Sequence, residues 1–284
     1  MRHPTIRLLH CMEQVQPRVI LHAGLLSAPS SYKTPSGCPL FDVRFEQMTI
    51  DPSTLEPSQR NGGTSAKDVA YIMFTSGSTG EPKGVIIEHQ SLATSIRAHG
   101  KLMRYGPDTR MLQQASYAFD ASIAEILTTL SFGGTVCIPS EADRLEDLPD
   151  VITRYKVNMA YMTPSLIRML RPQDLPTLRV LCFGGEAHDP SLYATWSEHV
   201  QLINGYGPTE TSVFCVGAWI GAGESFPLPI GEPMGCNAWV AEPVHAEHLV
   251  AYGAVGELLI EGPIVTRGYH RNDQRTAEQF LVDP

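Results

Sequence analysis

The sequence has few cysteines, and they follow no pattern. Six occur in 284 residues, and none stands in a Cys-x-x-Cys pair. Zinc sites and disulfide frameworks depend on close or regular cysteine spacing, so the sequence predicts neither, and reduced cysteines are the simple interpretation. The His-Ala-Glu-His run at residues 245–248 lacks the His-Glu-x-x-His spacing of zinc proteases. We interpret these histidines as solvated.

Long apolar runs and basic runs are also missing. No apolar segment approaches the length of a membrane span, and residues 1–7 lack the apolar core of a signal peptide. Lysine and arginine number 21 against 30 aspartates and glutamates, a net charge of −9. An acidic chain without a basic cluster is a poor candidate for nucleic acid or anionic membranes. We therefore expect a cytoplasmic protein with no nucleic-acid or membrane partner.

The sequence does contain a loop rich in glycine and hydroxyl side chains. It reads Thr-Ser-Gly-Ser-Thr-Gly-Glu-Pro-Lys-Gly over residues 75–84, between the apolar runs 69–74 and 85–87. Glycines let backbone N–H groups approach an anion, hydroxyls donate hydrogen bonds, and Lys83 adds a positive charge. Pro82 and Gly84 break the P-loop pattern. A flexible surface loop is the alternative, but the strand-like flanks favour a polyphosphate-binding loop.

Residues 68–89 resemble the signature of adenylate-forming (AMP-binding) enzymes, a family that includes acyl-CoA synthetases, luciferases and the adenylation domains of nonribosomal peptide synthetases. The resemblance implies that the loop handles the β,γ-phosphates of ATP while a substrate carboxylate attacks the α-phosphate. Further segments follow in the family's order. They are Gly184-Gly185-Glu186, the run Asn-Gly-Tyr-Gly-Pro-Thr-Glu at 204–210, Gly-Glu-Leu at 256–258 and Arg-Gly-Tyr at 267–269.

The resemblance also implies a role for each motif residue. Tyr206 would lie against adenine, Thr209 would contact the α-phosphate, and Glu210 would serve Mg²⁺, for which a carboxylate is a suitable hard ligand. The implied catalytic residues are Lys83, Thr209 and Glu210, with Glu210 as the metal ligand. The implied ATP-binding residues are Thr75, Ser76, Gly77, Ser78, Thr79, Gly80, Lys83, Gly184, Gly185, Glu186, Asn204, Gly205, Tyr206, Gly207 and Thr209.

The run Phe-Asp-Ala-Ser at 119–122 resembles the segment of adenylation domains that take α-amino acids, in which the aspartate pairs with the substrate ammonium. Asp120 is the implied counterpart; the alternative is a helix N-terminal aspartate bonded to backbone N–H groups. No charged group lines the implied side-chain pocket, so we expect an apolar or aromatic amino acid of medium or large size. The implied lining is Ala121, Ala124, Tyr161, Cys182, Gly184, Gly205, Val213 and Phe214.

Strand-like and helix-like segments alternate from Asp68 onward. Helical spacing covers 88–104 and 145–155, and short apolar runs stand at 135–138, 159–162, 180–183 and 202–203. This predicts an α/β fold of layered, mostly parallel sheets with helices. After Thr211 only strands are expected, at 212–220, 237–241 and 257–261, as a smaller β-rich lobe at the C-terminal end. We expect a partial N-terminal, connecting region at 1–67 (strand-like at 15–21 and 41–45), an ATP- and substrate-binding core at 68–211, and this lobe at 212–284.

From the resemblance we expect the chain to be incomplete at both ends, without much of the segment before the loop, the ribose-binding aspartate and the C-terminal catalytic subdomain. The first hypothesis is a nonribosomal peptide synthetase adenylation fragment, a ligase of secondary-metabolite biosynthesis that uses ATP and Mg²⁺ to form aminoacyl-AMP. It is not expected to be active alone, and in the intact parent its partner would be a carrier (thiolation) domain. The alternatives are an acyl or aryl acid-CoA ligase-type enzyme and a non-catalytic nucleotide-binding or interaction protein.

Overall fold

The computed structural model describes residues 5–23, 38–43, 63–76, 81–186, 190–221, 223–224 and 228–282. Residues 77–80 of the expected phosphate loop lie outside the described residues. Among the described helices, none combines the length and the apolar character needed to cross a bilayer.

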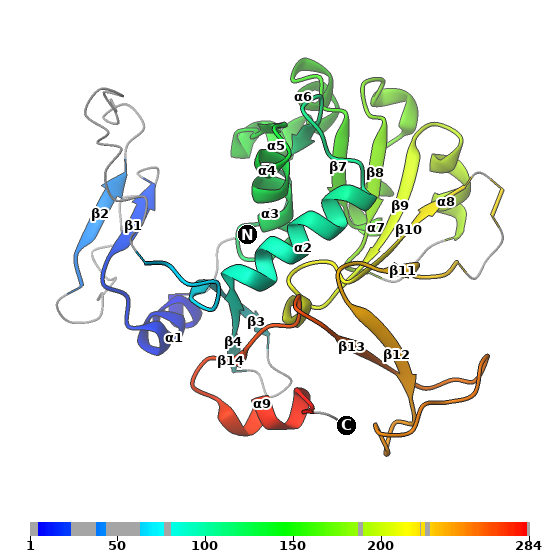
Figure 1. Cartoon of the computed structure of the whole chain (residues 1–284). Helices are drawn as coiled ribbons and strands as arrows, with labels where there is room; N and C mark the ends of the chain where they lie inside the picture. The colour runs from blue at the N-terminus through cyan, green and yellow to red at the C-terminus, as the bar shows by residue number, and fades with distance from the viewer. Residues whose placement is uncertain are drawn as a thin grey trace.

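A seven-stranded sheet forms the centre of the molecule (Figure 1), in the order β11-β10-β9-β8-β7-β5-β6. The five strands from β6 to β9 are parallel, and β10 and β11 continue the sheet in antiparallel pairing. This confirms the predicted α/β fold with mostly parallel strands. The strands are β5 (Arg110–Leu112), β6 (Thr135–Cys137), β7 (Met159–Met162), β8 (Val180–Phe183), β9 (Gln201–Tyr206), β10 (Val216–Ile220) and β11 (Glu232–Pro233).

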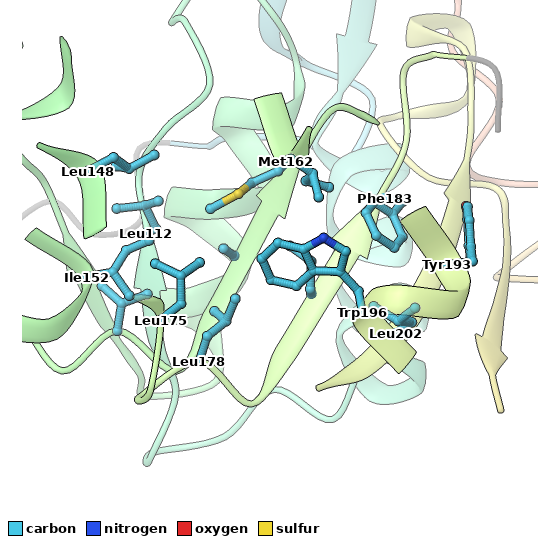
Figure 2. Close-up of a cluster of buried hydrophobic side chains, with 14 of the residues drawn as sticks. Leu112, Leu148, Ile152, Met162, Leu175, Leu178, Phe183, Tyr193, Trp196 and Leu202 are labelled. Carbon is cyan, nitrogen blue, oxygen red and sulfur yellow. The ribbon is translucent and has the colours of Figure 1, made fainter. Parts of the chain in front are cut away.

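Two buried clusters lie on opposite faces of this sheet. In β8, Leu181 and Phe183 belong to the first cluster, whereas Cys182 belongs to the second. Successive side chains of a strand point to opposite faces, so the sheet separates the clusters. The first cluster (Figure 2) packs the sheet against α6 (Leu148–Arg154), α7 (Pro164–Ile167) and α8 (Pro190–Ser197), with Trp196 and Phe183 among its largest fully buried side chains.

The second cluster is rich in methionine. It contains Met103, Met111, Met159 and Met234, whereas Met162 is the methionine of the first cluster. Helix α2 (His89–Leu102) packs on it through Ala98 and Leu102 and crosses the sheet in the view of Figure 1. Most of the expected substrate-pocket residues belong to this side of the sheet.

The helices follow the predicted pattern with three exceptions, the first being α1 (Thr5–Val15), which lies where no helix was expected. The helix expected at 145–155 is two helices, because the Asp147 side chain accepts from the N–H of Asp150 and caps a new helix there. The expectation of no helix after Thr211 is wrong, since Asn272 caps α9. The remaining helices are α1 (Thr5–Val15), α3 (Ala121–Ile123), the π-helix η3 (Ala124–Thr128), α4 (Thr129–Ser131), α5 (Glu141–Glu146), η4 (Pro172–Asp174), η5 (Thr209–Thr211) and α9 (Asp273–Gln279).

Three small sheets complete the described chain. β3 (Val69–Ser76) pairs with β4 (Pro82–Glu88) as predicted, and β14 (Gly268–Tyr269) adds to β4. β12 (Asn237–Ala241) and β13 (Glu257–Glu261) form an antiparallel pair at the expected positions. β1 (Ile20–Ala23) and β2 (Leu40–Val43) are parallel, and the strand expected at 15–21 is wrong at its start because Val15 ends α1.

The expected lobe boundary at residue 212 stays a prediction. The strand expected at 212–220 begins only at Val216, because Ser212 and Val213 have φ angles of 57° and 83°, which an extended strand does not adopt. From Val216 the chain continues the central sheet rather than leaving it.

Candidate functional site

The β3–β4 hairpin places the start and the end of the expected phosphate loop side by side. Thr75 is opposite Lys83 in the register, and Ser76 is opposite Pro82. Gly77, Ser78, Thr79 and Gly80 lie outside the described residues. The Thr75 hydroxyl oxygen is buried and has no hydrogen-bond partner among the described residues, so its hydrogen-bonding capacity is unused at the base of this loop.

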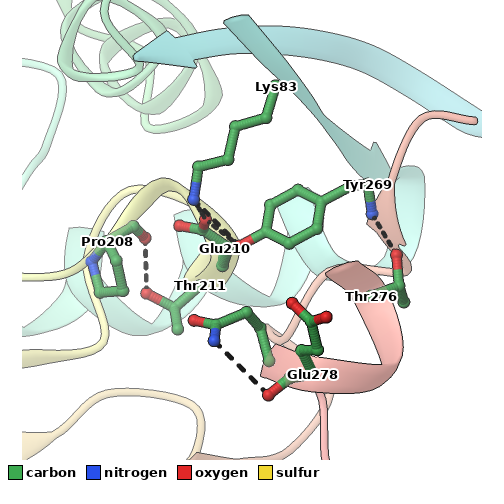
Figure 3. A network of polar contacts seen from close by, with 8 residues as sticks. Lys83, Pro208, Glu210, Thr211, Tyr269, Thr276 and Glu278 are labelled. Carbon is green, nitrogen blue, oxygen red and sulfur yellow. Dashed lines mark hydrogen bonds and ion pairs between the residues drawn. The ribbon is translucent and has the colours of Figure 1, made fainter. Parts of the chain in front are cut away.

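Lys83, Glu210 and Tyr269 form a closed polar triangle (Figure 3). The Lys83 Nζ donates to Glu210 Oε1 at 2.6 Å and to the Tyr269 hydroxyl at 3.0 Å, and that hydroxyl donates to the same Oε1 at 2.6 Å. The ammonium also lies 4.6 Å from the centre of the Tyr269 ring. Three elements distant in sequence, β4, η5 and β14, therefore converge here.

Both charged groups of this triangle are ionised. Burial alone would lower the pKa of Lys83, but its hydrogen bonds to Glu210 and Tyr269 outweigh burial and raise it. Burial alone would raise the pKa of Glu210, and the hydrogen bonds from Lys83 and Tyr269 lower it. A positive and a negative group thus stand in contact, each suited to one part of a metal–polyphosphate ligand.

The triangle offers a metal ion one protein carboxylate as a ligand, that of Glu210. The described residues contain no group of three or more histidines, cysteines, aspartates or glutamates that could hold a metal ion. Mg²⁺ is commonly held by one or two carboxylates together with substrate phosphates. Glu210 therefore fits a Mg²⁺ ion that arrives with a polyphosphate.

Asp120 has an unusual environment for a carboxylate. It precedes α3, and its side chain makes no capping hydrogen bond to that helix, although the backbone N–H groups of Ala121 and of Asp120 itself interact with the carboxylate. Its Oδ2 atom is buried and has no hydrogen-bond partner among the described residues. Burial raises the pKa of Asp120, hydrogen bonds from the Thr209 hydroxyl and from the N–H groups of Ala121 and Asp120 itself oppose the rise, and the negative charge of Glu210 adds to it. The substrate and metal motifs of the sequence therefore lie within electrostatic reach of each other.

The residues expected around a substrate side chain come together on the methionine-rich face. Tyr161 and Phe214 pack edge to face with ring centres 5.6 Å apart. A Cβ on Gly184 would lie 2.8 Å from the Tyr161 hydroxyl oxygen, and one on Gly205 would lie 2.9 Å from a Phe214 ring carbon. These glycines permit close packing of the walls. Buried Ala121, Ala124, Cys182 and Val213 complete the group.

The remaining motif residues follow the carboxyl ends of β8 and β9, where open α/β sheets form ligand crevices. Tyr206 ends β9 with its side chain 41% exposed, so its ring is accessible to a flat base. Gly185, after β8, has a φ of 81°. Exposed Glu186 accepts hydrogen bonds from the N–H and hydroxyl of Ser165, which lower its pKa. Buried Asn204 donates to the Pro229 carbonyl, so its side chain is used structurally.

Gly207 packs directly against the backbone of the turn that follows Glu210. A Cβ at this position would lie 2.3 Å from the Val213 carbonyl oxygen and 2.8 Å from the Phe214 Cα. Both atoms belong to the backbone and cannot move aside as a side chain can. The motif needs glycine here for close backbone approach.

Sequence reasoning did not assign Tyr269 to the site. The available signal is the Arg-Gly-Tyr segment at 267–269, which the family resemblance includes without giving Tyr269 a role. In the same segment Arg267 forms an ion pair with Glu88 at 2.6 Å and also donates to the Lys67 carbonyl. Arg267 is thus used to join the ends of the β3–β4 hairpin.

The comparisons with known proteins agree with this geometry. A family model described as AMP-binding enzyme matches residues 1–270. The chain belongs to the AMP-binding enzyme family. Nonribosomal peptide synthetase 8 of Aspergillus fumigatus is 42% identical over 287 residues, 99% of this chain and 3% of that protein. Nonribosomal peptide synthetase 5 of Gibberella zeae is 48% identical over 217 residues, 76% of this chain and 2% of that protein.

Solved structures share this fold. A holo four-domain nonribosomal peptide synthetase bound to AMP and glycine has a TM-score of 0.82 and 29% identity, over 100% of this chain and 21% of that one. The N-terminal subdomain of Klebsiella oxytoca NpsA has a TM-score of 0.82 and 24% identity, over 99% of this chain and 71% of that one, which shows the fold alone. Among nonribosomal peptide synthetases, the chain most resembles the adenylation domain, and it spans a small part of these large relatives.

Proposed function

We propose that this AMP-binding chain is the core of an adenylation domain that activates an amino acid. An oxygen of the substrate carboxylate would attack the α-phosphorus of ATP, and the bond from that phosphorus to the pyrophosphate oxygen would break. The products would be aminoacyl-AMP and pyrophosphate. Within a longer cytoplasmic synthetase of secondary metabolism, the aminoacyl group would pass to a carrier (thiolation) domain.

The observation that carries this proposal is the unpartnered Oδ2 atom of Asp120. A buried carboxylate oxygen without a partner destabilises a fold, because it has lost its water and gained nothing in exchange. The ammonium of an α-amino acid would supply the missing charge and hydrogen bond. A carboxylic acid without an ammonium would leave Asp120 unsatisfied, so the site would discriminate against it.

The triangle of Lys83, Glu210 and Tyr269 supports the nucleotide half of the proposal. Lys83 is proposed to bind the phosphates, with Thr75, Ser76 and the loop 77–80 supplying further donors. Thr209, one residue before Glu210, is proposed to contact the α-phosphate, and Tyr206 to lie against adenine. Glu210 would hold Mg²⁺, which when bound neutralises phosphate charge in the reaction.

The walls around Asp120 favour an apolar or aromatic substrate side chain. Tyr161 and Phe214 are aromatic, Cys182 and Val213 are apolar and buried, and the glycines at 184 and 205 add no side chain. A charged substrate side chain would be desolvated there without a partner, at a cost of several kcal/mol. Lysine, arginine, aspartate and glutamate are therefore excluded from the proposal.

Calorimetric titration of the full chain with a panel of acyl sulfamoyladenosines tests the proposed substrate class. These compounds imitate the acyl-adenylate and cannot react further. We expect aminoacyl members to bind and Asp120→Asn to weaken them at least 50-fold, because a neutral amide cannot pair with the ammonium. AMP is the control ligand, and its affinity should change less than threefold.

Other outcomes would contradict the proposal. Tighter binding of benzoyl or fatty-acyl sulfamoyladenosine than of every aminoacyl member would establish an acyl or aryl acid ligase instead. Binding of ATP without any acyl analogue would favour a non-catalytic nucleotide-binding protein. Exchange of labelled pyrophosphate into ATP, assayed with the same chain, measures whether it activates amino acids by itself.

A further inference from the structure

A chain of buried hydrogen bonds passes through α2 and joins two parts of the proposed site. The Ser95 hydroxyl donates to the Ser212 carbonyl at 2.5 Å and lies 3.2 Å from Nδ1 of His99. On the other side of the ring, His99 Nε2 lies 2.7 Å from the Thr128 hydroxyl. Each of the four residues is at most 1% exposed. Thr128 ends the π-helix η3, close after Asp120, and Ser212 follows the Thr209–Thr211 turn.

The donors and acceptors of this chain determine where the imidazole proton lies. Ser95 has one hydroxyl proton, and it uses this proton to donate a hydrogen bond to the Ser212 carbonyl. The Ser95 oxygen can therefore only accept from His99, which places the proton on Nδ1. Burial lowers the pKa of His99 to about 4, against the opposing effect of a hydrogen bond to the Ser95 backbone, so the ring is neutral at pH 7 and Nε2 carries no proton. The Thr128 hydroxyl must then donate to Nε2, and every member of the chain is satisfied.

The carbonyl at the end of this chain belongs to an unfavourable backbone turn. Ser212 and Val213 have φ angles of 57° and 83°, in the left-handed region that a β-branched valine rarely enters. Such a conformation persists where surrounding contacts fix it, and it is common beside functional sites. Ser95 holds the Ser212 carbonyl, and the Ser212 hydroxyl donates to the Ile264 carbonyl at 2.9 Å.

The turn matters because its two sides belong to different parts of the proposed site. Glu210 lies two residues before Ser212, and the pocket residues Val213 and Phe214 follow it directly. The His99 ring also packs edge to face on Phe214, with centres 5.4 Å apart. Helix α2 packs closely against η3 beside His99, since a Cβ on Gly100 would lie 3.0 Å from a Thr128 methyl carbon.

We propose that His99 is a positioning residue. Its Nδ1–H donates to Ser95, and Ser95 in turn fixes the left-handed turn at Ser212 and Val213 relative to the segment that follows Asp120. This turn then fixes Val213 and Phe214 as walls of the pocket. His99 would thereby control which substrate side chain is accepted without touching the substrate. The effect on selectivity rests on the proposed amino-acid site, whereas the effect on the turn does not.

Amide hydrogen exchange tests the effect on the turn in the full chain. The Ser212 N–H donates to Thr209 and the Cys215 N–H to Tyr206, so both amides report on this turn. We expect Ser95→Ala to speed their exchange at least tenfold. Ser91→Ala is the matched control, because Ser91 is an equally buried serine on the same helix that donates to Val265 instead. It should change these rates less than twofold.

A second pair of variants separates positioning from simple packing. Asn at position 99 can place an N–H where Nδ1–H stands, whereas Leu fills space without a donor. His99→Asn should keep exchange within threefold of the wild type, and His99→Leu should match Ser95→Ala. Equal rates in Ser95→Ala and Ser91→Ala, or slow exchange in a folded His99→Leu variant, would overturn the proposal. If His99→Leu does not fold, the serine pair alone decides.

Selectivity is measured with the aminoacyl sulfamoyladenosines used above. The readout is the Kd of the aminoacyl member that the wild type binds most weakly, divided by the Kd of the member that it binds most tightly. We expect Ser95→Ala to lower this ratio at least fivefold with the affinity for AMP unchanged, and Ser91→Ala to preserve it. An unchanged ratio would overturn the effect on selectivity. If the wild type binds no aminoacyl analogue, the proposed function fails, and the exchange result still decides the role of His99 in the turn.

Discussion

The Lys83 ammonium and the Glu210 carboxylate lie 2.6 Å apart although 127 positions separate them in the sequence. Each is proposed to bind a different part of Mg²⁺–ATP, and each now neutralises the other. The ligand must therefore separate the pair and offer a phosphate to one partner and a cation to the other. Tyr269, which contacts both groups, is placed to keep their side chains aligned during this exchange.

Replacement of Lys83 by alanine should weaken Mg²⁺–ATP binding at least tenfold, because charge-assisted contacts to the phosphates are lost. Binding of an aminoacyl sulfamoyladenosine should change less than threefold, since that compound has no β- or γ-phosphate. Titration calorimetry with both ligands measures the two effects on one preparation. A similar loss for both ligands would indicate misfolding rather than loss of a phosphate contact.

Replacement of Asp120 by asparagine should stabilise the protein at pH 7 by about 1 kcal/mol while removing amino-acid binding, since the buried oxygen has no partner. Its raised pKa means that Asp120 destabilises the fold only when ionised, so the gain should shrink as pH falls towards its ordinary 3.8. Urea unfolding at several pH values measures this. Exposed Asp108→Asn is the control, and a loss of stability in Asp120→Asn would contradict the prediction.

Glu125 should make stability depend on pH. Burial raises its pKa from 4.5 to about 7, against the opposing effect of N–H groups of Ala115 and Gln114. The folded protein thus holds this proton more tightly than the unfolded chain. The stabilising contribution is complete below pH 4.5 and is lost as pH rises through 7, with a size of roughly 3 kcal/mol.

The variant Glu125→Gln isolates this effect, because it carries no titrating proton. The difference in unfolding free energy between wild type and variant should favour the wild type more at pH 5 than at pH 7.5. His99 acts in the opposite direction: its lowered pKa gives stability above pH 6.5 that is lost as pH falls through about 4. It is present in both proteins and cancels in the difference. A difference independent of pH would contradict the prediction for Glu125.

Replacement of Gly207 by alanine should destabilise the protein by about 1–3 kcal/mol, because the added Cβ meets backbone atoms of Val213 and Phe214. Gly106→Ala is the matched control, since nothing lies within 4 Å of a Cβ there and its change should stay within about 0.5 kcal/mol. Urea unfolding of both variants measures the difference. Equal stabilities would mean that the turn after Glu210 can move away from Gly207.

The sequence was most informative where a pattern is local. The apolar runs at 159–162 and 180–183 coincide with β7 and β8, because buried parallel strands need apolar side chains on both faces. The contact between Lys83 and Glu210 could not be predicted in the same way, since it depends on how distant elements pack. The turn at Ser212 and Val213 also escaped prediction, because valine favours extended backbone and the contact that holds the turn comes from Ser95.

The methionine-rich cluster on the side of the proposed pocket affects how readily that pocket tolerates mutation. Methionine is unbranched and flexible, so it fills irregular spaces and adapts to changed neighbours at little cost. Met103, Met111, Met159 and Met234 lie on the side of the sheet that carries the proposed pocket, while the opposite side is packed mainly with leucine, isoleucine, valine and aromatic side chains. One face can thus accept mutations that reshape the proposed pocket, while the other face keeps the scaffold unchanged.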